Sequence, residues 1–160
     1  MNFVLLLDTN IKLFATVGSL TFVKHLINSI VFQNSLFSYG RSEMYLCFPP
    51  PLYLHLTCSN QAGYLLYRAS SVLFQLFFEH EFITKIPRKF FLPWQNDYKL
   101  TPHLKLSKFN LIDPEFMYLV KVVPRKDLYS HCLPDQMQAL WFFIKQHFIS
   151  RKNRVIPTLE

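Results

Sequence analysis

Glycine is scarce in this sequence, and its scarcity excludes one common kind of binding site. The 160 residues include only three glycines, Gly18, Gly40 and Gly63, and these lie far apart. Loops that bring backbone close to a dinucleotide or a phosphate need several closely spaced glycines, as in Gly-x-Gly-x-x-Gly. We therefore expect neither a dinucleotide-binding loop nor a glycine-rich phosphate cradle in this chain.

Cysteine is also scarce, and no metal cluster is indicated. Cys47, Cys58 and Cys132 are odd in number and form no Cys-x-x-Cys pair, so a disulfide framework and a zinc site are both disfavoured and a reducing compartment fits best. The triplet Glu79-His80-Glu81 is predicted to lie on a helix, where adjacent side chains point in different directions. We expect no metal to bind, and His131-Cys132 gives no basis for a catalytic Cys-His pair.

Long hydrophobic runs are missing as well. No uncharged apolar run approaches the roughly 20 residues that span a bilayer. The first residues show no basic leader before an apolar run of signal-peptide length, and no Arg-rich transit peptide is visible. These features predict a soluble protein without a membrane partner.

Hydrophobic and basic residues are what the chain has in abundance. It is 51% hydrophobic with 17 phenylalanines, ample for the packed core of one domain. Its net charge of +7 is uneven along the sequence, because residues 1–81 hold four basic and four acidic residues whereas residues 82–160 hold 13 and six. We expect a polyanion to meet the second half, the alternative being a merely solvated basic face.

Hydrophobic periodicity predicts strands alternating with helices. Apolar runs bounded by turn residues or prolines predict strands over 11–17, 43–48, 82–86 and 116–123. Apolar stripes of helical period predict helices over 22–31, 52–57, 65–77 and 134–148. The alternation predicts an α/β fold with a mainly parallel sheet. A polar linker is expected over 93–113, and the first strand is expected to leave one edge unpaired.

Three clusters are candidates for binding nucleic acid. Arg88, Lys89 and Phe91 lie in a proline-flanked loop with further aromatic residues, which suits phosphates and unstacked bases. Arg125 and Lys126 follow the last strand, and loops at the carboxyl ends of parallel strands form ligand sites. The third cluster is Arg151, Lys152 and Arg154 after the last helix. The alternatives are rings buried under the loop, an exposed turn and stabilisation of a helix dipole.

Specific strings in the sequence resemble a known family. These strings are Ile11–Ser19, Leu36–Met44, Lys85–Trp94 and Tyr118–Arg125, and the resemblance extends over roughly residues 11–157. They resemble the C-terminal half of the mitochondrial members of the rRNA adenine N6-methyltransferase family. None of these strings is as specific as a paired Cys-x-x-Cys.

The resemblance implies a fold and a set of functions. It implies a partial class I, Rossmann-like methyltransferase sheet with the last strand antiparallel, over residues 11–127, and the beginning of a helical C-terminal domain over 128–160. Members use S-adenosylmethionine to dimethylate adenines of rRNA in the mitochondrion. One mitochondrial paralogue also assists transcription, which implies RNA or single-stranded DNA, and the mitochondrial RNA polymerase, as partners.

The chain departs from this family in two respects. No counterpart of the cofactor-binding half precedes Ile11, so this chain alone is not expected to bind S-adenosylmethionine or to transfer methyl groups. Where the family carries an Asn-Leu-Pro-Tyr type motif, this chain has Val17, Gly18, Ser19 and Leu20. The Asn that would hold the adenine amine and the Tyr that would stack on the base are both lost.

Three hypotheses follow from the sequence. The first is a member of the dimethyltransferase family acting on mitochondrial rRNA and in mitochondrial transcription, represented by a chain without its cofactor site. The second is a noncatalytic nucleic-acid-binding transcription factor that assists promoter opening. The third is a structural remnant whose basic surface is only solvated and binds no polyanion.

Overall fold

Four strands form one mixed sheet in the order β1-β2-β4-β3. The computed structural model describes residues 8–59, 61, 66–91 and 115–148, and these contain β1 (Asp8–Thr16), β2 (Arg41–Phe48), β3 (Phe78–Pro87) and β4 (Phe116–Pro124). β1 and β2 are parallel, whereas β4 is antiparallel to both β2 and β3. The predicted α/β class and the antiparallel last strand are confirmed, and the arrangement is that of a partial Rossmann-like methyltransferase sheet.

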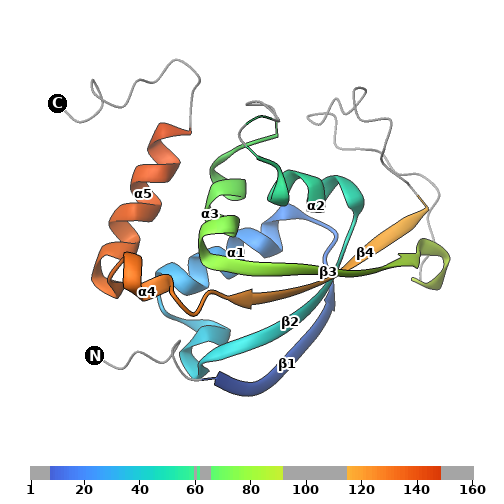
Figure 1. Ribbon diagram of the computed structural model, residues 1–160, viewed down its shortest axis with the longest axis horizontal. Coiled ribbons are helices and arrows are strands. Elements are labelled where there is room, and N and C mark those ends of the chain that lie inside the picture. The colour runs from blue at the N-terminus through green and yellow to red at the C-terminus, as the bar shows by residue number, and fades with distance from the viewer. Residues whose placement is uncertain (1–7, 60, 62–65, 92–114, 149–160) are drawn as a thin grey trace.

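The helices cover one face of this sheet. They are α1 (Leu20–Val31), α2 (Pro50–Thr57), α3 (Ala69–Phe77), α4 (Leu128–His131) and α5 (Met137–His147), with short 3-10 helices η2 (Ser35–Tyr39), η4 (Arg88–Phe90) and η5 (Pro134–Gln136). Figure 1 shows α1, α2 and α3 on the same side of the sheet, with α5 beside them. We call the side of the sheet away from these helices the open face.

Proline and glycine set the element boundaries, as their backbone limits require. Pro49 ends β2 and is the residue before α2, which begins at Pro50, because proline has no N–H for a sheet ladder but suits the first turn of a helix. Gly40 precedes β2 with φ of 119°, a conformation open to glycine and strained for other residues. Gly18, by contrast, has no neighbouring atom within 4 Å of where a Cβ would stand.

The core lies between the helices and the sheet. Side chains of β2 alternate, so that Met44, Leu46 and Phe48 are buried toward the helices. Phe74 of α3 is fully buried, and its ring centroid lies 5.4 Å from that of Phe78 at the start of β3. α3 passes into β3 without an intervening loop, because Phe77 ends the helix and Phe78 begins the strand.

α5 shares this core with the sheet. Its buried residues Met137 and Ile144 belong to the same hydrophobic cluster as those of α1 and α3. The ring of Phe32, just after α1, meets the ring of Trp141 edge-on at a centroid distance of 5.8 Å. The predicted apolar stripe of the last helix is confirmed, whereas the predicted domain boundary after residue 127 stays a prediction.

The open face carries the acidic side chains of the sheet in ion pairs. Glu43 of β2 lies 2.7 Å from Lys121 of β4 and 3.8 Å from Lys12 of β1. Lys121 holds the pKa of the Glu43 carboxyl below its ordinary value. Arg41 approaches Glu79 at 4.0 Å, and its Nε donates a hydrogen bond to the backbone oxygen of Pro124 at 2.6 Å. These acids are therefore already matched by cations.

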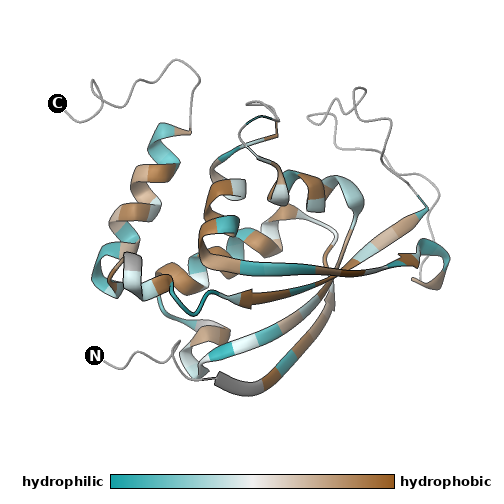
Figure 2. Ribbon diagram, in the orientation of Figure 1, coloured by the Kyte–Doolittle hydropathy of each residue, from teal (hydrophilic) through white to brown (hydrophobic). Residues whose placement is uncertain are grey.

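Hydrophobic residues remain exposed at the two sides of the fold. β1 is an edge strand, as predicted, and its Phe14 is 66% exposed on the open face. On the other side, Phe142 and Phe143 of α5 are exposed. Figure 2 shows both elements rich in hydrophobic residues. No described helix is long and apolar enough to cross a membrane.

Two sequence-based predictions of secondary structure are wrong. Residues 79–81 lie in β3, which begins four residues before the predicted strand, and not on a helix. The preceding helix, predicted over 65–77, begins at Ala69, and its apolar face buries Phe74 whereas Leu76 is exposed. The polar linker predicted over 93–113 lies outside the described residues.

Candidate nucleic-acid interface

Two of the predicted site segments lie at the same edge of the sheet. β1, β2 and β3 run in one direction, so their carboxyl ends share an edge. Val17–Leu20 follows β1, and Pro87–Phe91 begins with the last residue of β3; we call these two segments together the strand-end surface. Three strand spacings, about 14 Å, separate β1 from β3 across the sheet, and Pro87 lies three residues beyond Thr84, which is level with Thr16 at the end of β1.

The first segment offers little chemistry. Val17 is buried, and its N–H continues the β1–β2 ladder by donating to the backbone oxygen of Cys47 at 2.9 Å. Gly18 and Ser19 are exposed, and Ser19 is the residue before α1 although its side chain makes no capping hydrogen bond. Leu20 is half-buried against the core. The only polar side chain of this segment is therefore the hydroxyl of Ser19.

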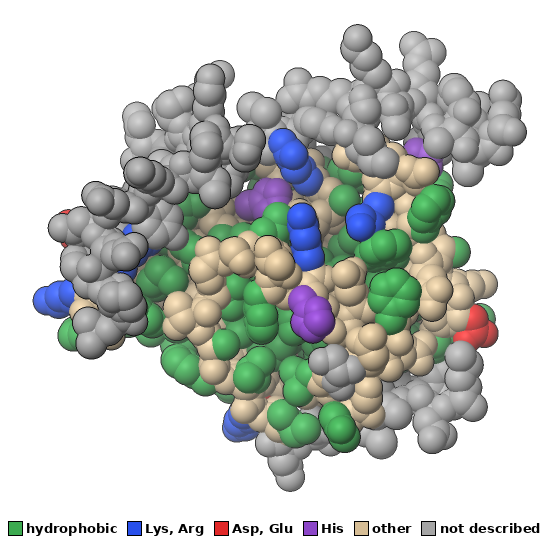
Figure 3. Space-filling model, turned by 180° about the vertical axis from the view of Figure 1, so that it is seen from behind, with side chains coloured by type: hydrophobic (Ala, Val, Ile, Leu, Met, Phe, Trp, Pro, Cys, Tyr) green, Lys and Arg blue, Asp and Glu red, His purple; other side chains and the backbone are tan. Residues whose placement is uncertain are grey.

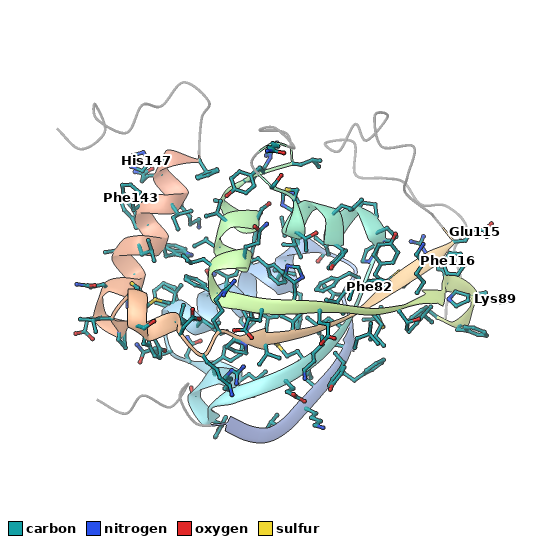
Figure 4. All side chains as sticks on the ribbon, viewed as in Figure 1. Phe82, Lys89, Glu115, Phe116, Phe143 and His147 are labelled. Atoms are coloured by element: carbon teal, nitrogen blue, oxygen red, sulfur yellow. The ribbon has the colours of Figure 1, made fainter. Side chains whose placement is uncertain are left out.

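The second segment combines an exposed cation with aromatic rings. Lys89 and Phe90 are exposed, with the Lys89 Nζ 5.7 Å from the centroid of the Phe90 ring, and Phe91 is half-buried. Figure 4 shows Lys89, Glu115 and Phe116 together at this end of the sheet, far from Phe143 and His147 on α5. Phe90 is 69% exposed, so it presents more free ring surface than Phe91 does.

Arg88 differs from the prediction made for it. Its side chain is only 8% exposed, with Nη2 3.9 Å from the sulfur of Met117, and its backbone N–H donates to the backbone oxygen of Glu115 at 2.7 Å. The backbone hydrogen bond joins the end of β3 to the residue before β4. Burial of the side chain leaves the guanidinium little access to a phosphate. Lys89 is therefore the accessible cation of this pair.

An aromatic cluster that sequence reasoning did not find lies where α2 packs on β3 and β4, centred five residues before the second segment along β3. Tyr53 of α2, Phe82 of β3 and Tyr118 of β4 contact one another, with ring centroids 5.4 to 6.4 Å apart. Lys85 lies over the Tyr118 ring at 5.7 Å, and Phe82 is 43% exposed. Burial and the neighbouring Tyr118 raise the pKa of Tyr53. The only sequence signal for this cluster was aromatic residues in strands, which is common.

Arg125 and Lys126 lie at the opposite edge of the sheet, so the reason for their prediction was wrong. β4 is antiparallel, and its carboxyl end pairs with the beginning of β3, as Pro124 lies opposite Phe78. The ten residues of β3 span roughly 30 Å. Arg125 Nε also donates to the backbone oxygen of Gln75 at 3.2 Å, which joins β4 to α3.

Arg151, Lys152 and Arg154 lie outside the described residues. In the part of the chain that the structure describes, no group of three His, Cys, Asp or Glu side chains could hold a metal ion. His80 is half-buried in β3, and burial followed by the charge of Arg125 lowers the pKa of its imidazole.

The residues at this edge do not fit S-adenosylmethionine. A class I site needs a glycine-rich turn for close backbone approach and an acidic residue for the ribose hydroxyls. Gly18 is the only glycine in either segment of the strand-end surface, and it is not closely approached by other atoms. Neither segment contains an Asp or Glu.

Comparison with known proteins finds one close similarity. The chain is 56% identical over 153 residues to a protein of Drosophila melanogaster named dimethyladenosine transferase 2, mitochondrial. The match covers 96% of this chain and 34% of the fly protein, so the chain spans about a third of the length of that relative. No family model matches the chain.

Proposed function

Because the chain belongs to the mitochondrial dimethyladenosine transferases, we propose that it forms part of an S-adenosylmethionine-dependent rRNA adenine N6,N6-dimethyltransferase of mitochondria. The observation that carries this proposal is the 56% identity, which extends over nearly the whole chain. The part proposed for this chain is the side of the catalytic domain that meets the target nucleotide. Residues 11–127 would form this part, and residues 128–160 would begin a helical C-terminal domain.

The geometry of the strand-end surface supports a role in holding RNA. Lys89 offers an exposed ammonium for a phosphate, and Phe90 and Phe91 offer rings on which an unpaired base could stack. Phe82, the exposed ring of the cluster with Tyr53 and Tyr118, lies on β3 five residues before Pro87 and adds aromatic surface along the same strand. Cations and aromatic rings at one edge are the combination that single-stranded nucleic acid requires.

A second candidate function is noncatalytic binding of nucleic acid in mitochondrial transcription, with the mitochondrial RNA polymerase as partner. The observation that favours it is the sequence of the first segment. Val17, Gly18, Ser19 and Leu20 supply no amide side chain to hold an adenine amine and no ring to stack on it. The candidate functions share the strand-end surface and differ in whether a methyl group is transferred.

Titration with S-adenosylmethionine tests the expectation that this chain alone does not bind the cofactor. We expect the purified chain to give no saturable heat in a calorimetric titration, because it lacks the glycine-rich turn and the ribose-binding acid. Saturable binding would contradict this account and would place a cofactor site in this chain.

Substitution of Lys89 tests the strand-end surface itself. We expect Lys89→Gln to weaken binding of a fluorescein-labelled single-stranded RNA and to reduce the slope of log K against log salt by about 0.7, the loss of one phosphate contact. Fluorescence anisotropy at several salt concentrations measures both quantities.

Lys126→Gln is the matched control for this experiment. Lys126 is also an exposed lysine just after a strand, but it lies at the opposite edge of the sheet. Its substitution should leave the salt slope unchanged. Equal effects of the two substitutions would show general attraction to a basic protein, and no effect of Lys89→Gln would remove the strand-end surface from the proposal.

A further inference from the structure

Charge in this fold is separated by layer and not by sequence half. The described acidic side chains of the sheet, Glu43, Glu79 and Glu81, lie on strands, and the first two pair with cations across the open face. Helices α1, α2, α3 and α5 contain no Asp or Glu at all. The prediction that the first half is electrically neutral therefore misses that the formal charges within these four helices are all positive, whereas the nearby acids Asp127 and Asp135 precede α4 and α5.

The cations of this layer come from elements far apart in sequence. Lys24 and His25 are exposed on α1, Arg68 is exposed at the residue before α3, and Lys145 is exposed on α5. We call these four residues the helix-layer surface. Figure 3, the view from behind, shows Lys, Arg and His side chains together among hydrophobic ones, with acidic side chains visible only at the rim.

Two contacts fix how this surface is assembled. The charges of Arg68 and Lys24 both act on the imidazole of His55, a buried residue of α2, and add to burial in lowering its pKa. His55 Nε2 lies 2.8 Å from the hydroxyl of Ser70, two residues after Arg68, so α2 and the start of α3 meet there. Lys145 Nζ lies 4.1 Å from the ring centroid of Trp141, which itself contacts Phe32 after the last turn of α1.

The spacing suits an extended anion. Lys24 and Phe32 are eight residues apart along α1 and its end, which is about 12 Å of helix. Lys145 lies over Trp141, whose ring meets Phe32 at the end of α1, so Lys145 is near the C-terminal end of this helix whereas Lys24 is in its N-terminal half. A single small anion could not contact both lysines, whereas a nucleic-acid backbone, with regularly repeated phosphates, could.

We propose that the helix-layer surface is a second nucleic-acid-binding surface, which contacts the sugar-phosphate backbone of RNA without reading its bases. Flexible lysines positioned against phosphates give affinity and salt dependence but no sequence preference. No acidic side chain from α1, α2, α3 or α5 opposes the approach of phosphates. This surface is defined by side chains on the helices, whereas the strand-end surface is defined by the segments at the ends of β1 and β3, and the two adjoin at α1, where Lys24 lies one helical turn after Leu20.

The test compares two double substitutions, each of which lowers the net charge of the protein by two. Lys24→Gln/Lys145→Gln removes two charges from the helix-layer surface, and Lys12→Gln/Lys121→Gln removes two from the open face, where both lysines pair with Glu43. A short fluorescein-labelled RNA duplex of mixed sequence is titrated with the full 160-residue chain at several salt concentrations. Unfolding midpoints in urea confirm that each variant is folded.

We expect only the helix-layer pair to change binding. Loss of two phosphate contacts should reduce the salt slope by about 1.8, so that over a fourfold rise in salt the variant loses about tenfold less affinity than the unsubstituted chain. Equal slope changes in the two variants, or none in the helix-layer variant, would overturn the proposal.

Two further measurements separate this proposal from its alternatives. Vesicles of phosphatidylcholine with and without cardiolipin replace RNA in a sedimentation assay. Lys24- and Lys145-dependent binding to the anionic vesicles, with no change in RNA binding, would assign the surface to a membrane and overturn the proposal. A loss of RNA binding in Lys89→Gln together with an unchanged helix-layer variant would reject this inference alone and leave the strand-end surface intact.

Discussion

Replacement of Phe74 by alanine is expected to lower the free energy of unfolding by about 3–5 kcal/mol. Phe74 is fully buried in α3, and its ring contacts Phe78 at 5.4 Å and His80 at 5.8 Å between centroids. Removal of the ring therefore leaves a cavity at the place where the helix layer meets the start of β3. Equilibrium unfolding in urea, followed by circular dichroism, measures the loss.

Phe142→Ala is the matched control for this prediction. Phe142 lies on α5 and is 59% exposed, so its truncation should change the free energy of unfolding by no more than about 0.5 kcal/mol. Phe74→Leu keeps much of the buried apolar volume and should lose less than Phe74→Ala. Similar losses for Phe74→Ala and Phe142→Ala would contradict the position of α3 on the sheet.

Replacement of Ser71 by alanine is expected to cost about 1–3 kcal/mol, because it removes the buried hydrogen bonding of its hydroxyl to two backbone oxygens. Ser71 is fully buried in α3, and its Oγ lies 2.5 Å from the backbone oxygen of His55 and 3.2 Å from that of Leu66. The hydroxyl thus joins α2, the segment before α3 and α3 itself. The change in urea midpoint at constant m-value measures the cost.

Ser38→Ala provides the comparison for Ser71→Ala. Ser38 is exposed in η2, and its Oγ makes one long hydrogen bond of 3.4 Å to the backbone oxygen of Gln33. Its loss should be within experimental error of zero, since water replaces the bond. If Ser71→Ala were equally harmless, the buried hydroxyl would not hold the two helices together.

The fold class could be predicted from the sequence, because the spacing of apolar residues and the backbone restrictions of proline are visible within a few neighbouring residues. The apolar stripe of α1 was predicted from Val23, Ile27 and similar residues, which are buried, and the end of β2 was predicted from Pro49. The beginning of β3 was not predictable in this way. Phe77 and Phe78 are both apolar and both buried, so nothing in the local pattern marks the change from helix to strand.

The candidate site was only partly predictable, because it depends on how strands are ordered. The sequence placed Lys89 and Phe91 in a loop after a strand, and they lie there. It placed Arg125 at a ligand-bearing edge on the rule for parallel strands, and the rule does not apply to an antiparallel strand. The burial of Arg88 could not be predicted from the sequence either, because Arg88 contacts Met117, a residue 29 positions away.

The family resemblance read from the sequence is confirmed by the identity to the fly protein. Its strength came from continuous strings such as Lys85–Trp94 and not from a short motif. Such strings identify a family but do not tell on which layer of the fold each charged side chain lies. Acids and bases that cancel along the sequence are sorted to different layers by the fold, so a neutral segment can still present a basic surface.

The position of β4 sets the order in which this sheet can be completed. β4 is last in the sequence, yet it pairs with both β2 and β3. A nascent chain growing at 5–20 residues per second needs roughly 2–7 seconds to extend from Pro87 to Pro124. Within the described sheet, β3 has no partner strand during that interval, so its exposed Phe82 and Ile83 make it the segment of the emerging chain most open to chaperones.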